Sequence, residues 1–166
     1  MTFHPAPRCP GNGASGFMWI TLTEGEQRLA QYISAARQAH NRRVGAVATP
    51  YGGKNVEQIG LESYGAELAF CRLHNVYPDF KTDEYGIEDA MLHDGRTVDV
   101  KCTNGRRLFV KAMKRPEICD LYAMMVCDWP RFRFAGWIEA FELFTDARLD
   151  QNLEHPAYVA DERDLT

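Results

Sequence analysis

Apolar and polar positions in the first half of the chain follow a helical period. Apolar residues recur every three or four positions from Thr23 to about His40, where Thr23 and Glu26 have the spacing of a capping box. A second apolar stripe runs from about Val56 to Leu73. These two segments are expected to be helices, joined by a connection that contains glycine.

The apolar runs that follow are short, and turn residues separate them as in a series of strands. Strands are expected at Glu84–Leu92, Thr97–Cys102, Arg107–Ala112, Leu121–Cys127 and Phe132–Ile138. Asp94-Gly95 favours a hairpin between the first two runs, so the first three strands are expected to form a meander. The run at 121–127 is almost wholly apolar, which is typical of a central strand covered on both faces and often paired in parallel. A crossover at 114–120 and a short helix at 139–144 complete the predicted elements.

This order of elements indicates an α/β fold with a mixed sheet of about five strands flanked by helices. A chain of 166 residues suits one such domain. Residues 1–22 are rich in proline and glycine and are expected to form an arm without fixed structure, followed by a helix and linker over 23–54. The core is expected over 55–145, and residues 146–166 are expected to be an acidic tail.

Composition excludes several classes of function. No apolar run approaches the roughly 18 residues that a membrane-spanning helix needs, and the N-terminus does not have the pattern of a secretory signal. The five cysteines include no C-x-x-C pair and are expected to be reduced thiols of a cytoplasmic protein. The sequence has no phosphate-binding glycine motif, so no nucleotide cofactor is expected.

Charge is unevenly distributed along the chain. The net charge is −4, but residues 139–166 carry eight acidic and two basic side chains, so the remainder of the chain is net positive. The stretch 101–115 holds six basic residues and no acid. Such a stretch is either a contact surface for nucleic-acid phosphates or a solvated hairpin surface. Its candidate DNA contacts are Thr103, Arg106, Arg107, Lys111 and Lys114, with a structural role as the alternative for the threonine hydroxyl.

One predicted strand carries two charges inside an apolar run. In Thr97-Val98-Asp99-Val100-Lys101, side chains alternate between the two faces of the strand. Asp99 and Lys101 therefore share one face, while the two valines point into a core. A carboxylate and an amine two positions apart can form a surface ion pair or part of a reactive site.

Two further carboxylates precede this strand in the chain. Asp89 lies five residues before the Asp94-Gly95 turn and Asp99 lies four residues after it, so a hairpin brings them within one or two rungs of each other. Glu67 lies in the middle of the second predicted helix, where a glutamate more often faces solvent. Paired carboxylates repel each other unless a cation lies between them.

These groups suit a divalent cation and an activated water. Asp89, Asp99 and the carbonyl of Val100 are expected to ligate Mg²⁺, with Glu67 contributing through water. Lys101 is expected to position or deprotonate the attacking water, or to stabilise charge on a phosphate. The alternative is an α/β domain in which Asp99 and Lys101 form only an ion pair.

The set of Glu67, Asp89 and Asp99-Val100-Lys101, with gaps of 22, 10 and 2, resembles the PD-(D/E)XK nuclease superfamily over roughly residues 56–144. The spacing is most similar to archaeal-type Holliday junction resolvases and to small phage proteins. The resemblance implies a restriction-endonuclease-like core, two metal-binding aspartates, a catalytic lysine and a metal-linked helix glutamate. It also implies Mg²⁺- or Mn²⁺-dependent hydrolysis of DNA phosphodiesters, action as a homodimer, and the cytoplasm of a phage-infected or bacterial cell.

The sequence departs from the family pattern at two points. Glu88 stands before Asp89, where the pattern has proline, and the crossover at 114–120 is shorter than the helix expected there. A second interpretation is therefore a nuclease-like DNA- or protein-binding module without catalytic activity.

Overall fold

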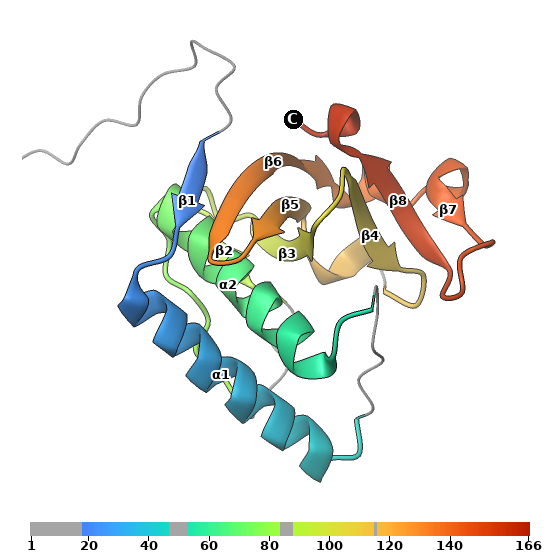
Figure 1. The fold of residues 1–166 in the computed structure, drawn as a ribbon. Coiled ribbons are helices and arrows are strands. Elements are labelled where there is room, and N and C mark those ends of the chain that lie inside the picture. Colours follow the sequence, from blue (N-terminus) through green and yellow to red (C-terminus); the bar gives the residue numbers. More distant parts are fainter. Residues whose placement is uncertain (1–17, 47–52, 84–87, 115) are drawn as a thin grey trace, which may run out of the picture.

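A computed structural model describes residues 18–46, 53–83, 88–114 and 116–166 of the chain. They form an α/β fold around a mixed five-stranded sheet with the order β1-β6-β5-β3-β2 (Figure 1). Its strands are β1 (Trp19–Thr21), β2 (Ala90–Met91), β3 (Thr97–Thr103), β5 (Leu121–Asp128) and β6 (Arg131–Glu139). β3 and β5 are parallel and the other pairs are antiparallel. β5 is central and buried over most of its length, which confirms the prediction from its apolar run.

Two stacked helices cover one face of this sheet, α1 (Glu24–Arg43) outside α2 (Val56–His74) (Figure 1). Both predicted helices are confirmed, and α1 begins with the predicted capping box of Thr23 and Glu26. α2 packs closely on the sheet because it has glycine at position 65. A Cβ atom there would lie 2.7 Å from the Trp129 ring and 2.8 Å from the Phe132 ring.

A second, three-stranded sheet covers the opposite face of the central sheet (Figure 1). Its order is β4 (Arg107–Lys111), β8 (Ala157–Asp161), β7 (Leu149–Asp150), and α3 (Ala140–Leu143) packs beside it. Short 3-10 turns lie at Pro116–Ile118, Asp146–Arg148 and Glu162–Asp164. The mixed sheet thus has helices on one face and a smaller sheet on the other, rather than helices on both.

Three expectations about the elements are corrected by this arrangement. β4 leaves the predicted meander and pairs with β8 instead, so the segment 146–166 is an ordered part of the fold and not a tail. Leu108 lies opposite Ala160 in this pairing, and both are at most 1% exposed. The buried apolar side chains of β4 are therefore covered with the help of β8, which belongs to the C-terminal segment.

The two other differences concern short strands. Residues 19–21, expected to lie in an arm without structure, form β1 and pair with residues 131–133 of β6. The strand expected at 84–92 is reduced to β2, and residues 84–87 lie outside the described residues. A pairing of two or three residues gives too weak an apolar pattern to be recognised in a sequence.

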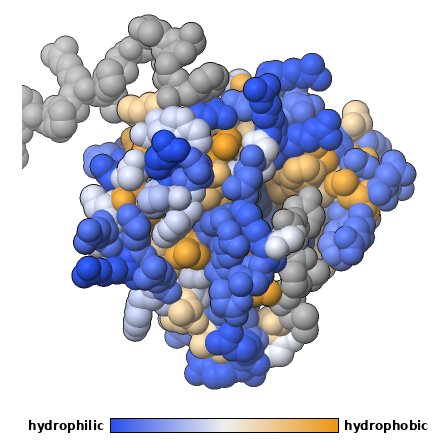
Figure 2. Space-filling model, in the orientation of Figure 1, coloured by the Kyte–Doolittle hydropathy of each residue, from blue (hydrophilic) through white to orange (hydrophobic). Residues whose placement is uncertain are grey.

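The surface seen in Figure 2 is mostly hydrophilic, with apolar residues in small separate groups. In the part of the chain that the structure describes, no helix has the length and apolar character needed to cross a membrane.

Candidate active site

Asp89 and Asp99 lie close together at the β2–β3 hairpin, with Asp89 directly before β2 and Asp99 in β3. Ala90 pairs with Val98 in this ladder, and the backbone N–H of Asp89 donates to the Val98 carbonyl at 2.9 Å. Because this N–H bonds to Val98 and not to Asp99, Asp89 and Ala90 both lie beside Val98, as in a β-bulge, and Asp89 is close to Asp99 without being its paired residue. The carboxylate of Asp89 also accepts a hydrogen bond from the Val100 N–H at 2.7 Å. The juxtaposition predicted from the hairpin spacing is confirmed.

β3 presents its charged side chains to the face of the sheet that is turned toward β4. Val98 and Val100 pack in the cluster beneath α2, as predicted, so Asp99 and Lys101 point the other way. Their register partners on β5 are Tyr122 and Met124, which belong to the core between the two sheets. Asp99 is only 2% exposed, so its charge needs partners.

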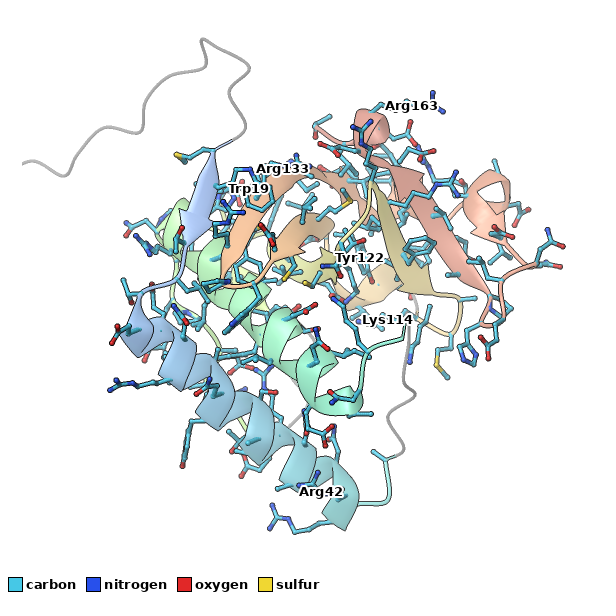
Figure 3. The ribbon with its side chains drawn as sticks, in the orientation of Figure 1. Trp19, Arg42, Lys114, Tyr122, Arg133 and Arg163 are labelled. Carbon is cyan, nitrogen blue, oxygen red and sulfur yellow. The ribbon has the colours of Figure 1, made fainter. Side chains whose placement is uncertain are left out.

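Two lysines provide those partners for Asp99. The ammonium of Lys101 contacts Oδ1 of the carboxylate, and the ammonium of Lys114 contacts Oδ2. Lys114 comes from the connection that follows β4 and is labelled, with Tyr122, in Figure 3. Burial alone would raise the pKa of Asp99, but the two neighbouring ammonium groups lower it below its ordinary value.

Glu67 approaches the same sheet edge from α2. It is 7% exposed, and its two carboxylate oxygens accept hydrogen bonds from the Arg37 guanidinium at 3.0 and 3.2 Å. Arg37 also donates to the Asp79 carbonyl at 3.3 Å and lies 4.7 Å from the centre of the Tyr64 ring. The mid-helix glutamate is therefore buried and paired rather than exposed to solvent.

The pKa values of Glu67 and Asp89 are raised in part by the charge of a neighbouring carboxylate. Burial raises the pKa of Glu67 to about 8, with a further contribution from the charge of Asp89 and an opposing one from Arg37. Burial raises the pKa of Asp89 to about 6, and the charge of Asp99 adds to that rise. A cation bound between these groups would relieve both burial and mutual repulsion.

We expect these shifts to make the metal-free protein less stable as pH rises from 6.5 to 8. The native Glu67 binds a proton with a pKa of about 8, whereas its ordinary value is 4.5, so in this window the native state holds a proton that the unfolded state has lost. The free energy of unfolding should fall by about 1.5 kcal/mol over the window, as proton linkage requires. Urea denaturation in EDTA at several pH values measures it.

The variant Glu67→Gln separates the contribution of Glu67 to this pH dependence from the contributions of other titrating groups. Burial lowers the pKa of His74 from 6.5, so His74 raises stability slightly as pH rises from 6.5, against the effect of Glu67, and Asp89 with its pKa of about 6 adds a small fall at the same end of the window. The lowered pKa of Asp99 acts below 3.8. Glu67→Gln should remove the slope, while Glu117→Gln, an exposed carboxylate, should retain it. Equal slopes in both variants would contradict the assignment to Glu67.

The donor set fits a hard divalent cation. Asp89 and Asp99 supply carboxylate oxygens, and Val100 turns its N–H toward Asp89, so its carbonyl points to the same edge of the sheet. The oxygens of Glu67, Asp89 and Asp99 do not all lie within 4.8 Å of one another among the described residues. The three carboxylates therefore do not form one preformed set of ligands, and a Mg²⁺ ion there would be held by one or two of them and by water.

The predicted DNA contacts do not form one continuous basic surface. Arg107 pairs with Asp161 of the acidic β8 at 3.1 Å, and Lys114 contacts Asp99. The Thr103 hydroxyl accepts a hydrogen bond from the Gly105 N–H at 3.1 Å, which is the structural alternative weighed for it. Arg106, directly before β4, and Lys111, at the end of β4, are both exposed.

Two features of the site were not expected from the sequence. The first is the pairing of Arg37 with Glu67. Arg37 is a charged residue on the buried stripe of α1, seven positions after Ala30 and four after Ile33, and this placement is the one sign of its role in the sequence. An open groove of about 510 Å³ leads to Asp89 and is lined by residues 77–81 and 88–91. The groove depends on long-range packing and leaves no recognisable pattern in the sequence.

Comparison with known proteins gave no family for the chain. No protein-family model matches the sequence, and no curated protein matches it.

Proposed function

We propose that this protein is a metal-dependent nuclease that hydrolyses DNA phosphodiester bonds, with a restriction-endonuclease-like arrangement of its core. One observation carries the proposal: the carboxylates of Asp89 and Asp99 lie close together at the edge of the sheet, with the Lys101 ammonium on Asp99 and Glu67 linked to Asp89 by charge. The four residues come from α2, from the residue before β2 and from β3, in the order that the family resemblance implies.

Each residue has a role that its surroundings support. Asp89, Asp99 and the Val100 carbonyl would hold Mg²⁺ or Mn²⁺, which when bound polarises a phosphate and lowers the pKa of water. Glu67 is fixed in orientation by Arg37 and can hold a water of the metal.

The proton affinity of Lys101 favours one of its two predicted roles. Burial alone would lower the pKa of this amine, but the charges of Asp99 and Asp89 raise it above the ordinary value. In the metal-free protein these charges favour the ammonium form of Lys101. Its role in the proposed reaction is to stabilise negative charge on the phosphate.

The groove beside Asp89 supports access of a strand of DNA to these groups. Tyr77 is 81% exposed and lies at an edge of the groove, with Phe80 in its lining. Aromatic rings in such positions can stack on bases of a single strand. Lys81 in the same lining can contact a phosphate.

We expect Asp89→Asn to abolish metal-dependent cleavage, because it removes a ligand and leaves the fold of the hairpin in place. Linear duplex, single-stranded, flap and four-way-junction DNA would be incubated with the wild-type protein and the variant in Mg²⁺, Mn²⁺ or EDTA. The matched control is Asp128→Asn, whose carboxylate is 57% exposed and pairs with Arg131. Equal cleavage by the wild type and Asp89→Asn would contradict the proposal.

A catalytically inactive module is favoured by a different observation. Both oxygens of Asp99 already contact ammonium groups, so the charge of this carboxylate is compensated within the protein. The same assay distinguishes the two functions: an inactive module would bind DNA or another protein and cut none of the four substrates in either metal.

A further inference from the structure

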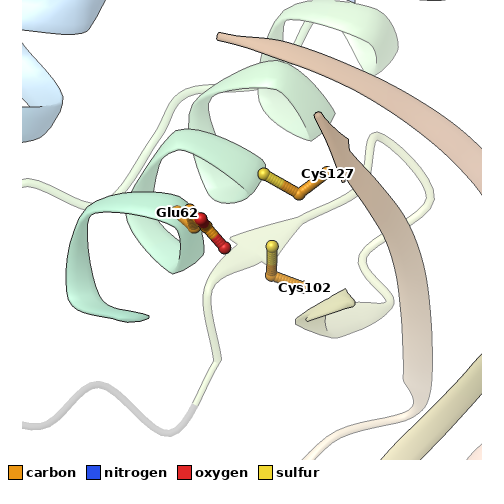
Figure 4. A group of neighbouring side chains, drawn as sticks. All are labelled: Glu62, Cys102 and Cys127. Atoms are coloured by element: carbon orange, nitrogen blue, oxygen red, sulfur yellow. The ribbon is translucent and has the colours of Figure 1, made fainter. Parts of the chain in front are cut away.

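Three side chains with metal-binding atoms meet on the α2 side of the central sheet. Glu62 of α2, Cys102 of β3 and Cys127 of β5 place their ligand atoms within 4.8 Å of one another and point toward a common centre (Figure 4). Among the residues that the structure describes, they are the only trio of His, Cys, Asp or Glu with this property. No local motif marks this trio, since 25 positions separate Cys102 from Cys127 in the chain and neither belongs to a C-x-x-C pair.

This cluster is separate from the candidate active site. Cys102 follows Lys101 on β3, so its side chain points to the opposite face of the strand, toward α2. Glu62 is 7% exposed and Cys127 is 4% exposed, so the cluster is largely shielded from water. A buried carboxylate in this position needs a cationic partner.

Polar groups hold the carboxylate of Glu62 in place. The Gln58 amide donates to its Oε1 at 3.0 Å, and the Lys54 ammonium contacts its Oε2. Lys54 also contacts the side-chain oxygen of Asn104, whose amide donates to the Cys127 carbonyl at 2.9 Å. The Gln58 amide therefore orients the carboxylate of Glu62 as an outer-shell group does at protein metal sites, while the Lys54 ammonium is the cation that this carboxylate now contacts.

We propose that Glu62, Cys102 and Cys127 form a binding site for a thiophilic divalent cation of the Zn²⁺ class. Thiolates select Zn²⁺ over Mg²⁺, and cysteine sulfur and glutamate oxygen are both zinc ligands, so three protein ligands and a water can complete a tetrahedral site. The two thiols release their protons to solvent as the cation binds, and the fourth position is left to a water. Lys54 competes with the cation for the carboxylate of Glu62.

The site would connect the elements that carry the candidate active site. Its ligands come from α2, β3 and β5, and α2 and β3 also supply Glu67 and Asp99. A cation bound by the native state alone stabilises that state by mass action. Removal of the cation is therefore expected to lower the thermal stability of the whole domain.

Co²⁺ binding to the fully reduced protein tests the proposal without any activity measurement. Wild type is expected to bind one Co²⁺ with thiolate-to-cobalt charge-transfer absorption and the intense visible bands of tetrahedral cobalt, and Zn²⁺ should displace it. Cys102→Ala and Cys127→Ala should each weaken Co²⁺ binding by at least ~100-fold, since even the loss of an outer-shell partner costs about 10- to 100-fold. Cys119→Ala, a buried cysteine outside the trio, is the matched control.

A further variant keeps the test valid if the cysteine variants do not fold. Lys54→Met removes the competing ammonium and should bind Co²⁺ more tightly than wild type. Absence of charge-transfer absorption in folded, reduced wild-type protein would overturn the proposal. Retention of that absorption in both Cys102→Ala and Cys127→Ala would also overturn it, as would a disulfide between these two cysteines in protein that binds no cobalt when reduced.

Discussion

Asp99→Asn is expected to destabilise the protein by about 3 kcal/mol, measured by urea denaturation at neutral pH. The substitution keeps the size of the side chain but removes the negative charge that faces Lys101 and Lys114. Loss of one partner of a buried ion pair typically costs about 3–5 kcal/mol, because the remaining charge is left uncompensated. The lower end applies since the two lysine side chains are 26% and 33% exposed.

Removal of one lysine should partly reverse this loss. In the double variant Asp99→Asn with Lys114→Met, one of the two unpaired ammonium groups is gone, so stability should recover relative to Asp99→Asn alone. Asp128→Asn removes an exposed ion pair and should cost less than about 1 kcal/mol. A loss at Asp99 as small as that at Asp128 would mean that the two lysines do not depend on this carboxylate.

Lys101→Met is expected to reduce the rate of metal-dependent DNA cleavage by about 10²- to 10⁴-fold, the usual range for one positioned catalytic group. The carboxylates remain and Asp99 keeps its contact with Lys114, so metal binding and folding should change little. The measurement is the single-turnover rate at saturating metal, together with the metal concentration for half-maximal rate.

Lys101→Arg distinguishes the role of the ammonium charge. An arginine retains the positive charge at this position, so it should recover part of the rate that methionine loses. Arg28→Met removes an exposed cation of α1 and serves as the control for general charge effects. Equal rates for wild type and Lys101→Met would exclude a catalytic role for this lysine.

The sequence predicted the elements that have a strong local pattern. The capping box at Thr23, the apolar stripe of α2, the hairpin at Asp94-Gly95 and the apolar run of β5 each reflect contacts that are close in sequence or burial on both faces. Pairing of β4 with β8 could not be predicted in the same way. Its two strands are separated by 45 residues between Lys111 and the opposing Ala157, and β8 is a short run, Ala-Tyr-Val-Ala-Asp, in which apolar and polar positions do not alternate.

In the candidate site, too, the contacts set by local structure could be predicted and those set by tertiary packing could not. Asp89 and Asp99 were predictable because one tight turn fixes their register, and Lys101 followed from strand alternation. The pairings of Arg37 with Glu67 and of Lys114 with Asp99 depend on how α1 and the connection after β4 pack on the sheet. Such contacts follow from the tertiary structure and have no fixed spacing in the chain.

The measurement that tests the central claim most directly is a titration of wild-type DNA cleavage with Mn²⁺ from a metal-free start. The proposed site predicts no cutting in EDTA, cutting that rises with Mn²⁺ to saturation, and thermal stabilisation of the protein over the same range of metal concentration. Saturable cleavage that is absent from Asp89→Asn would establish the nuclease. Cleavage in EDTA, or no cleavage of any DNA by folded protein at saturating metal, would contradict it.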